Sequence, residues 1–217
     1  MIPGGAWLTA DPAGFDGLAR HLAESGVMAI TVTVRAAEDG AVYPAPVEDV
    51  LCAVAFGAAK AEAQGSDPGP VVVLGHSSGA HLAALAVLAF DDFVPPCDVP
   101  VAAPDGLVGL AGSYDISLIP EVAEPFFGGS PEADPETWRA GNPLLQAGRR
   151  PEIPVFLAHG DQDDLVPMAF TTEFGDALRQ HGHPTTVSIV TGADHLEIFG
   201  AEVSGDLIVD WVLDLAS

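Results

Sequence analysis

Short apolar runs alternate with longer amphipathic or alanine-rich stretches along almost the whole chain. The short runs have the length and the β-branched content of buried strands, and the stretches between them are long enough for helices. The predicted strands are 27–34, 70–74, 106–110, 155–158 and 185–190. The predicted helices are 12–25, 46–64, 78–90, 167–180 and 196–215, the last broken near Gly200 or Gly205. This alternation predicts an α/β fold with a mostly parallel sheet and helices on both faces.

The segment 113–154 departs from this alternation because it is long and rich in Pro and Gly. Connections of this length in a compact domain usually serve a function. We therefore expect a single domain over residues 1–217, with a partly helical, lid-like insertion at about 113–154 over the site. No internal repeat and no domain linker is visible in the sequence.

The charge of the chain narrows the range of partners. It carries 31 acidic and 7 basic residues, a formal net charge of −24, while 48% of its residues are hydrophobic. Such a surface repels phosphate backbones and anionic lipid headgroups, so we expect neither a nucleic-acid nor a membrane partner. The length and the apolar share allow one sizeable core.

The N-terminal residues, the length of the apolar runs and the cysteines bear on the cellular location. The start lacks a basic segment followed by an apolar one, and no apolar run approaches the length of a membrane helix, so we expect a cytoplasmic protein. Cys52 falls in a predicted helix and Cys97 in a predicted loop. We expect both to be reduced in that compartment, although a disulfide between them stays open.

Candidate chemistry begins at Gly75-His76-Ser77-Ser78-Gly79, between a predicted strand and a predicted helix. A G-x-S-x-G motif in that context is typical of a nucleophile elbow, which exposes the serine hydroxyl at the end of the strand. The amide of Ser78, at the start of the helix, could receive an oxyanion. The alternative is a turn that uses glycine and serine for its geometry alone.

A serine nucleophile needs a base, and the base needs an orienting acid. The loop after the strand 155–158 holds Asp161, Asp163 and Asp164, and the loop after the strand 185–190 holds His195. Because parallel strands end at the same edge of a sheet, both loops should lie near Ser77. This pattern predicts a Ser-Asp-His triad with His195 as the base.

With these pieces, the chain resembles the α/β-hydrolase superfamily of the esterase/lipase type. It is most similar to the small carboxylesterase-like group that includes kynurenine formamidases. The family's acid motif, His-Gly-x-x-Asp-x-x-Val-Pro, implies that Asp163 is the acid and that His159 is structural. The matching pieces are PGGAW (3–7), YPAPVEDV (43–50), GHSSGAH (75–81), SYDIS (113–117), FFGGSPE (126–132), NPL (142–144), HGDQDDLVP (159–167) and GADH (192–195).

The resemblance also implies an oxyanion hole and the walls of a pocket. The family loop His-Gly-Gly-x-Trp corresponds to residues 3–7, with Pro3 in place of the histidine. The oxyanion hole is therefore expected from the amides of Gly4, Gly5, Ala6 and Ser78. Candidate substrate-binding residues are Trp7, His76, Phe126 and Phe127, with ordinary core packing as the alternative for the aromatic ones.

The chain departs from the family at its start. In the family, strands precede the loop at 3–7, whereas this sequence has only Met1 and Ile2 of the last of them. The N-terminal strands thus look missing. We expect either that they lie upstream of the given sequence or that the strand 27–34 pairs directly with 71–74.

The expected function is a metal-independent serine hydrolase that cleaves a small carboxylic ester through an acyl-enzyme, without a cofactor. Ser77 is the expected nucleophile, His195 the base and Asp163 the residue that orients it. Two alternatives stay open, an arylformamidase that acts on an N-formyl amide and a non-catalytic or truncated relative. The expected partner is a small ester or amide substrate, and a homodimer is among the oligomeric states left open.

Overall fold

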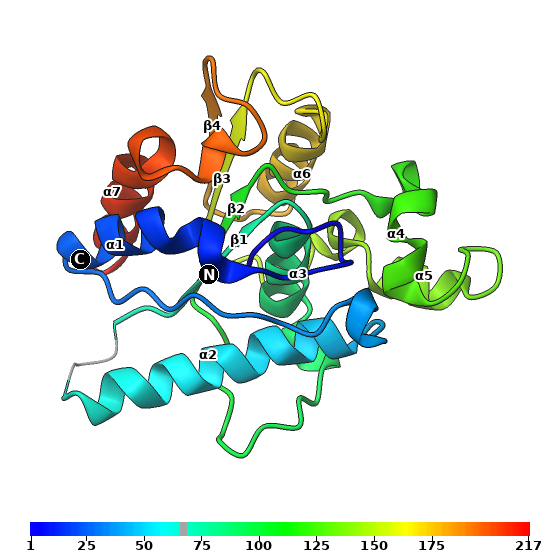
Figure 1. Cartoon of the computed structure of the whole chain (residues 1–217), viewed down its shortest axis with the longest axis horizontal. Coiled ribbons are helices and arrows are strands. Elements are labelled where there is room, and N and C mark those ends of the chain that lie inside the picture. The colour runs from blue at the N-terminus through cyan, green and yellow to red at the C-terminus, as the bar shows by residue number, and fades with distance from the viewer. Residues whose placement is uncertain (66–68) are drawn as a thin grey trace.

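The computed structural model describes residues 1–65 and 69–217. Within these ranges, four parallel strands form one sheet in the order β1-β2-β3-β4 (Figure 1). The strands are β1 (Val72–His76), β2 (Gly106–Leu110), β3 (Val155–Gly160) and β4 (Thr185–Val190). They match four of the five predicted strands to within a few residues.

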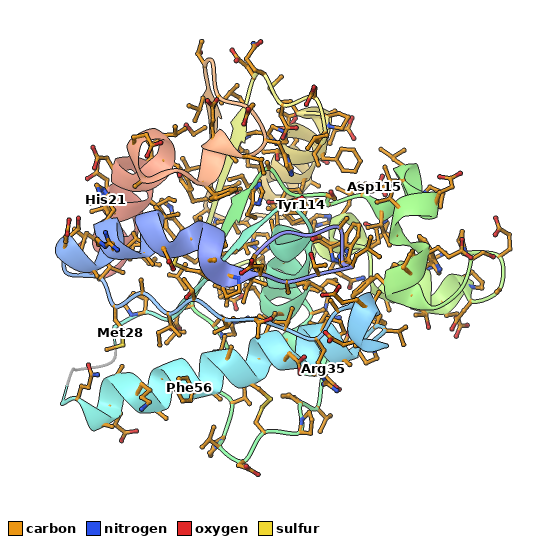
Figure 2. All side chains as sticks on the ribbon, viewed as in Figure 1. His21, Met28, Arg35, Phe56, Tyr114 and Asp115 are labelled. Atoms are coloured by element: carbon orange, nitrogen blue, oxygen red, sulfur yellow. A yellow bond between two sulfur atoms is a disulfide. The ribbon has the colours of Figure 1, made fainter. Side chains whose placement is uncertain are left out.

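Helices cover both faces of the sheet. One core contains side chains from α2 (Ala45–Ala63), α3 (Ser78–Leu88) and α6 (Ala169–Gln180), and a second core contains side chains from α1 (Asp16–Glu24) and α7 (Asp206–Leu215). Leu107 of β2 belongs to the first core and the next residue, Val108, to the second, as the alternation of side chains along a strand requires. Figure 2 labels one side chain from each layer, Phe56 on α2 and His21 on α1.

The helix boundaries follow local signals in the sequence. The predicted helix at 12–25 is a short 3-10 segment, η1 (Pro12–Phe15), followed by α1, and the Asp11 carboxylate caps it by accepting from the Ala13 amide at 3.0 Å. The predicted break at Gly200 is also present. It separates η6 (Glu197–Phe199) from η7 (Ala201–Gly205), a π-helical turn that leads into α7.

The predicted strand at 27–34 does not form. Met1 and Ile2 lie between this segment and β1, with Ile2 in a parallel bridge to Gly75. The Met1 amino group donates to the Ile30 carbonyl at 2.8 Å, and the Ile2 amide donates to the Leu74 carbonyl at 2.7 Å. Two residues are too few to build a ladder along 27–34, so the β-branched run stays irregular. The alternative of direct pairing with β1 is therefore wrong.

The expectation of reduced cysteines is also wrong. Cys52 and Cys97 form a disulfide, with their Cα atoms 5.5 Å apart. It ties α2 to the connection between α3 and β2. The two cysteines are 45 positions apart in the sequence, and nothing in the residues between them indicated this proximity.

The segment 113–154 holds two short helices, α4 (Pro120–Phe127) and α5 (Pro135–Ala140), which lie on the side of the molecule opposite α1 and α7 (Figure 1). It also holds two 3-10 turns, η4 (Ile116–Leu118) and η5 (Pro143–Gln146). Among the described residues, none of the helices has the length and apolar character needed to cross a membrane.

Candidate active site

Ser77 occupies the sharp turn between β1 and α3. Its backbone has φ 54° and ψ −124°, a strained conformation for a residue with a side chain. The turn is also tight: a Cβ on Gly75 would lie 2.2 Å from the Gly79 carbonyl oxygen, and one on Gly79 would lie 2.3 Å from that of Ile2. Only glycine fits at these two positions, which explains the spacing of the motif.

The three residues predicted as a triad come together at one edge of the sheet. The Ser77 hydroxyl lies 3.0 Å from Nε2 of His195, and Nδ1 of His195 lies 2.6 Å from Oδ2 of Asp163. They come from the carboxyl ends of β1, β4 and β3. The Asp161 side chain instead accepts from the Gly192 amide at 2.8 Å, so of the three aspartates Asp163 is the one that contacts the ring.

The Asp163 carboxylate is fully buried and is held by several donors. Oδ1 accepts from the amides of Leu165 and Val166, both at 2.9 Å. Burial by itself raises the pKa of Asp163, but the hydrogen bonds from Val166, His195 and Leu165 outweigh it and lower the pKa below its ordinary value. The carboxylate therefore stays ionised at neutral pH.

His159 fixes the loop that carries Asp163. Its Nε2 lies 2.9 Å from the Val166 carbonyl oxygen and 3.1 Å from the Asp163 carboxylate, and its Nδ1 accepts from the Thr171 hydroxyl at 2.7 Å. Burial lowers the pKa of His159, which keeps the ring neutral. These contacts agree with the structural role that the family motif implied.

His76, which precedes the serine, contacts the backbone of the predicted base. Its Nε2–H donates to the His195 carbonyl at 2.8 Å, and its ring lies against those of His195 and Phe199, with centroids 4.7 and 4.6 Å away. Burial, together with the neighbouring His195, lowers the pKa of His76 to about 4. His76 is therefore a neutral donor at neutral pH.

A pocket of about 560 Å³ opens at Ser77. Of the predicted site residues, it is lined by Gly4, Gly5, Ala6, Trp7, His76, Ser77, Ser78 and His195. Sequence reasoning did not assign a further set to the site, mostly apolar: Pro3, Asp11, Gly14, Phe15, Ser113, Ile119, Val122, Leu165, Val166, Leu196 and Phe199. Leu165, Val166 and Leu196 adjoin the triad loops, so their place in the sequence could have indicated them.

The loop at 3–7 passes directly beside the predicted nucleophile. A Cβ on Gly4 would lie 2.9 Å from Cβ of Ser77, so glycine permits the close approach. Gly5 has φ +149°, and a Cβ there would lie 2.3 Å from the Thr9 carbonyl oxygen. Ala6 and Trp7 also have positive φ values, 52° and 59°, which marks a strained turn at the pocket.

Phe126 and Phe127 do not line this pocket, and their prediction as substrate-binding residues is wrong. Phe126 is 1% exposed and lies against the ring of Trp7, with centroids 5.8 Å apart. Phe127 stacks on Trp138 at 4.3 Å. Trp7 belongs to both the pocket and the core. It lines the pocket, and its Nε1–H donates to Nδ1 of the buried His81 at 3.2 Å.

A parallel sheet between helices, with a serine on a strand-to-helix turn and an aspartate and a histidine at later strand ends, defines the α/β-hydrolase class of the esterase/lipase type. The BD-FAE family model matches residues 1–178, and the chain belongs to this family. The resemblance to kynurenine formamidases stays a prediction.

Several curated proteins with similar sequences are named as esterases. The chain is 29% identical to the probable carboxylic ester hydrolase LipM of Mycobacterium tuberculosis, over 83% of this chain and 44% of that protein. It is 26% identical to the isoprenylcysteine alpha-carbonyl methylesterase ICME of Arabidopsis thaliana, over 92% of this chain and 50% of that protein. The chain thus spans about half the length of the curated relatives it matches.

Solved structures share the fold. A truncated form of a carbohydrate esterase from gut microbiota has a TM-score of 0.83 at 19% identity, covering 99% of this chain and 84% of its own. The acetyl ester-xyloside bifunctional hydrolase from Caldicellulosiruptor lactoaceticus has a TM-score of 0.82 at 23% identity, covering 98% of this chain and 80% of its own. These likenesses confirm the predicted α/β-hydrolase fold.

Proposed function

We propose that this protein is a serine hydrolase that cleaves a small carboxylic ester. The observation that carries the proposal is the hydrogen-bonded line from Asp163 through His195 to Ser77 at the floor of an open pocket. The names of the curated relatives, among them a carboxylic ester hydrolase and a methylesterase, support the same reaction class.

In the proposed first step, His195 takes the Ser77 proton on Nε2 while Oγ attacks the ester carbonyl. Asp163, ionised and buried, keeps the proton of the ring on Nδ1 and stabilises the imidazolium that forms. The imidazolium then protonates the departing alkoxide, and the acyl group stays on Ser77. Water, activated by the same ring, hydrolyses this acyl-enzyme and restores the serine.

The charge that develops on the carbonyl oxygen needs preorganised donors. We assign this role to the amides of Ser78, at the N-terminus of α3, and of Gly5 and Ala6 in the strained loop. The close approach of Gly4 to Ser77 supports this assignment because it brings the loop backbone beside the side chain of the proposed nucleophile.

Covalent labelling of the folded chain with a fluorophosphonate, read by intact mass, tests the proposal. We expect one adduct on the wild type and none on Ser77→Ala, because only an activated serine reacts readily with this reagent. Hydrolysis of p-nitrophenyl acetate should be lost in the same variant. A chain that circular dichroism shows to be folded but that takes no adduct would contradict the proposal and favour a non-catalytic relative.

A further inference from the structure

Three apolar side chains stand exposed at the mouth of the pocket. Val122 of α4 is 49% exposed, Leu165 in the loop after β3 is 68% exposed, and Leu196 in the loop after β4 is 62% exposed. All three also line the pocket that contains Ser77. We call these three residues the apolar rim.

Single exposed leucines are common on protein surfaces and need no explanation. The apolar rim differs because its members come from three separate segments and surround one opening. A cluster of exposed apolar side chains typically marks a binding site, and a ligand that covers these three has to extend from the pocket to the surface. Their shared place in the pocket indicates that this ligand is the substrate.

The position of the rim indicates which part of the substrate it contacts. His195 must protonate the leaving alcohol from Nε2, so the alcohol has to depart beside this ring. Leu196 directly follows His195, and Leu165 follows Asp163 by two residues with its amide on that carboxylate. Leu165 and Leu196 therefore lie on the leaving-group side of Ser77, and Val122 lines the same opening.

The charges around the pocket restrict the substrate further. The described residues that line it include no lysine and no arginine, and Asp11 is their one carboxylic acid. An anionic substrate would find no counter-charge there, and the net charge of −24 repels it at long range. The same charge argues against an anionic lipid surface as the occupant of the rim.

We propose that the apolar rim binds the alcohol part of a neutral ester whose alcohol is an aryl or alkyl group rather than a sugar. This proposal rests on the proposed esterase function. The alcohol group packs on Leu165, Leu196 and Val122 while the carbonyl lies at Ser77, and burial of its apolar surface favours it over a polar alcohol of equal size.

Two acetates of similar length and leaving-group basicity test the proposal, 2-phenylethyl acetate and 2-(2-methoxyethoxy)ethyl acetate. We expect the wild type to prefer the phenylethyl ester by about tenfold or more in kcat/KM, and the preference to fall about fivefold in Leu165→Ser and in Leu196→Ser. The matched control is Leu145→Ser in η5, where the leucine is 56% exposed and outside the pocket lining, and its preference should equal that of the wild type.

An unchanged preference in both rim variants, with Ser77-dependent turnover intact, would overturn the rim proposal and leave the esterase intact. Loss of sedimentation with neutral phosphatidylcholine vesicles in the rim variants, without a change in preference, would overturn it in favour of a lipid contact. If the folded wild type hydrolyses neither ester and takes no fluorophosphonate adduct, the esterase function itself fails.

Discussion

At the scale of single residues, His76 links the nucleophile turn to the loop that carries the predicted base. It sits between Gly75 and Ser77 in the chain, yet its ring reaches the backbone of His195 and donates to that carbonyl. The loop after β4 is thereby tied to the turn after β1. A base that moves away from the serine hydroxyl by a fraction of an ångström loses much of its effect.

We therefore expect His76→Phe, which keeps a ring but loses the donor, to lower kcat by about tenfold with little change in KM. His76→Gln can still donate to the His195 carbonyl and should recover most of the rate. Steady-state kinetics on p-nitrophenyl acetate would measure both parameters. Equal loss in the two variants would show that the ring fills space and does not position His195.

The placement of Ser77 and His195 at the carboxyl edge of the sheet could be predicted because its signals are local. Each residue follows a predicted strand, and the tight turn around Ser77 requires the glycines that the sequence contains. Phe126 and Phe127 could not be placed in this way, since an aromatic pair in a long connection looks the same whether it faces a pocket or a core. Their burial depends on Trp7 and Tyr43, which are distant in the chain.

At the scale of elements, the four runs that pair along a ladder were predicted, whereas the run at 27–34, which has no ladder, was wrongly predicted as a strand. The runs that became β2 and β3 are paired on both sides and are buried along their whole length. The run at 27–34 is richer in β-branched residues than either of them but has only Met1 and Ile2 beside it. A high β-propensity does not by itself produce a strand where no neighbouring strand provides backbone hydrogen bonds.

The disulfide links two elements, and no local feature of the sequence predicted it. Cys52 lies in α2, and Cys97 lies in the connection that leads to β2. Closing a loop of this length removes conformational freedom from the unfolded chain, and disulfides typically stabilise a fold by about 2–4 kcal/mol in this way.

We expect the free energy of unfolding to fall by about 2–4 kcal/mol after reduction, and equally in the double variant Cys52→Ala/Cys97→Ala. Urea unfolding with and without a reductant would measure the change, and the double variant should show no response to the reductant. A wild type that is indifferent to the reductant, while free thiols are detected, would contradict the expected stabilisation.

At the scale of the whole molecule, two electrostatic effects act in opposite directions as the pH falls. Protonation of surface carboxylates relieves the repulsion of a chain with net charge −24 and thereby stabilises the fold. Buried histidines that stay neutral in the fold have the opposite effect, because the unfolded chain binds protons that the folded chain rejects. Carboxylates whose pKa the fold lowers, such as Asp163, add to this second effect, because the unfolded chain binds their protons more readily. Stability as a function of pH therefore reports the sum of these opposing effects.

His81 allows the second effect to be isolated. It is fully buried, and its ring donates from Nε2 to the Gly141 carbonyl at 2.9 Å and accepts from Trp7 at Nδ1. Burial lowers the pKa of His81 to about 3, so its contribution to stability is complete above pH 6.5 and is lost as the pH falls toward 3. Between pH 7 and pH 5 this loss amounts to about 2 kcal/mol.

His81→Gln keeps a donor and an acceptor but cannot be protonated. The surface charge changes with pH equally in both proteins, so its effect cancels in the difference between them. We expect the wild type to lose about 2 kcal/mol more than the variant on going from pH 7 to pH 5, measured by urea unfolding at each pH. If both proteins lose the same amount, the ring is accessible to protons in the fold, and the closed packing of Trp7 over His81 at the wall of the pocket would have to be revised.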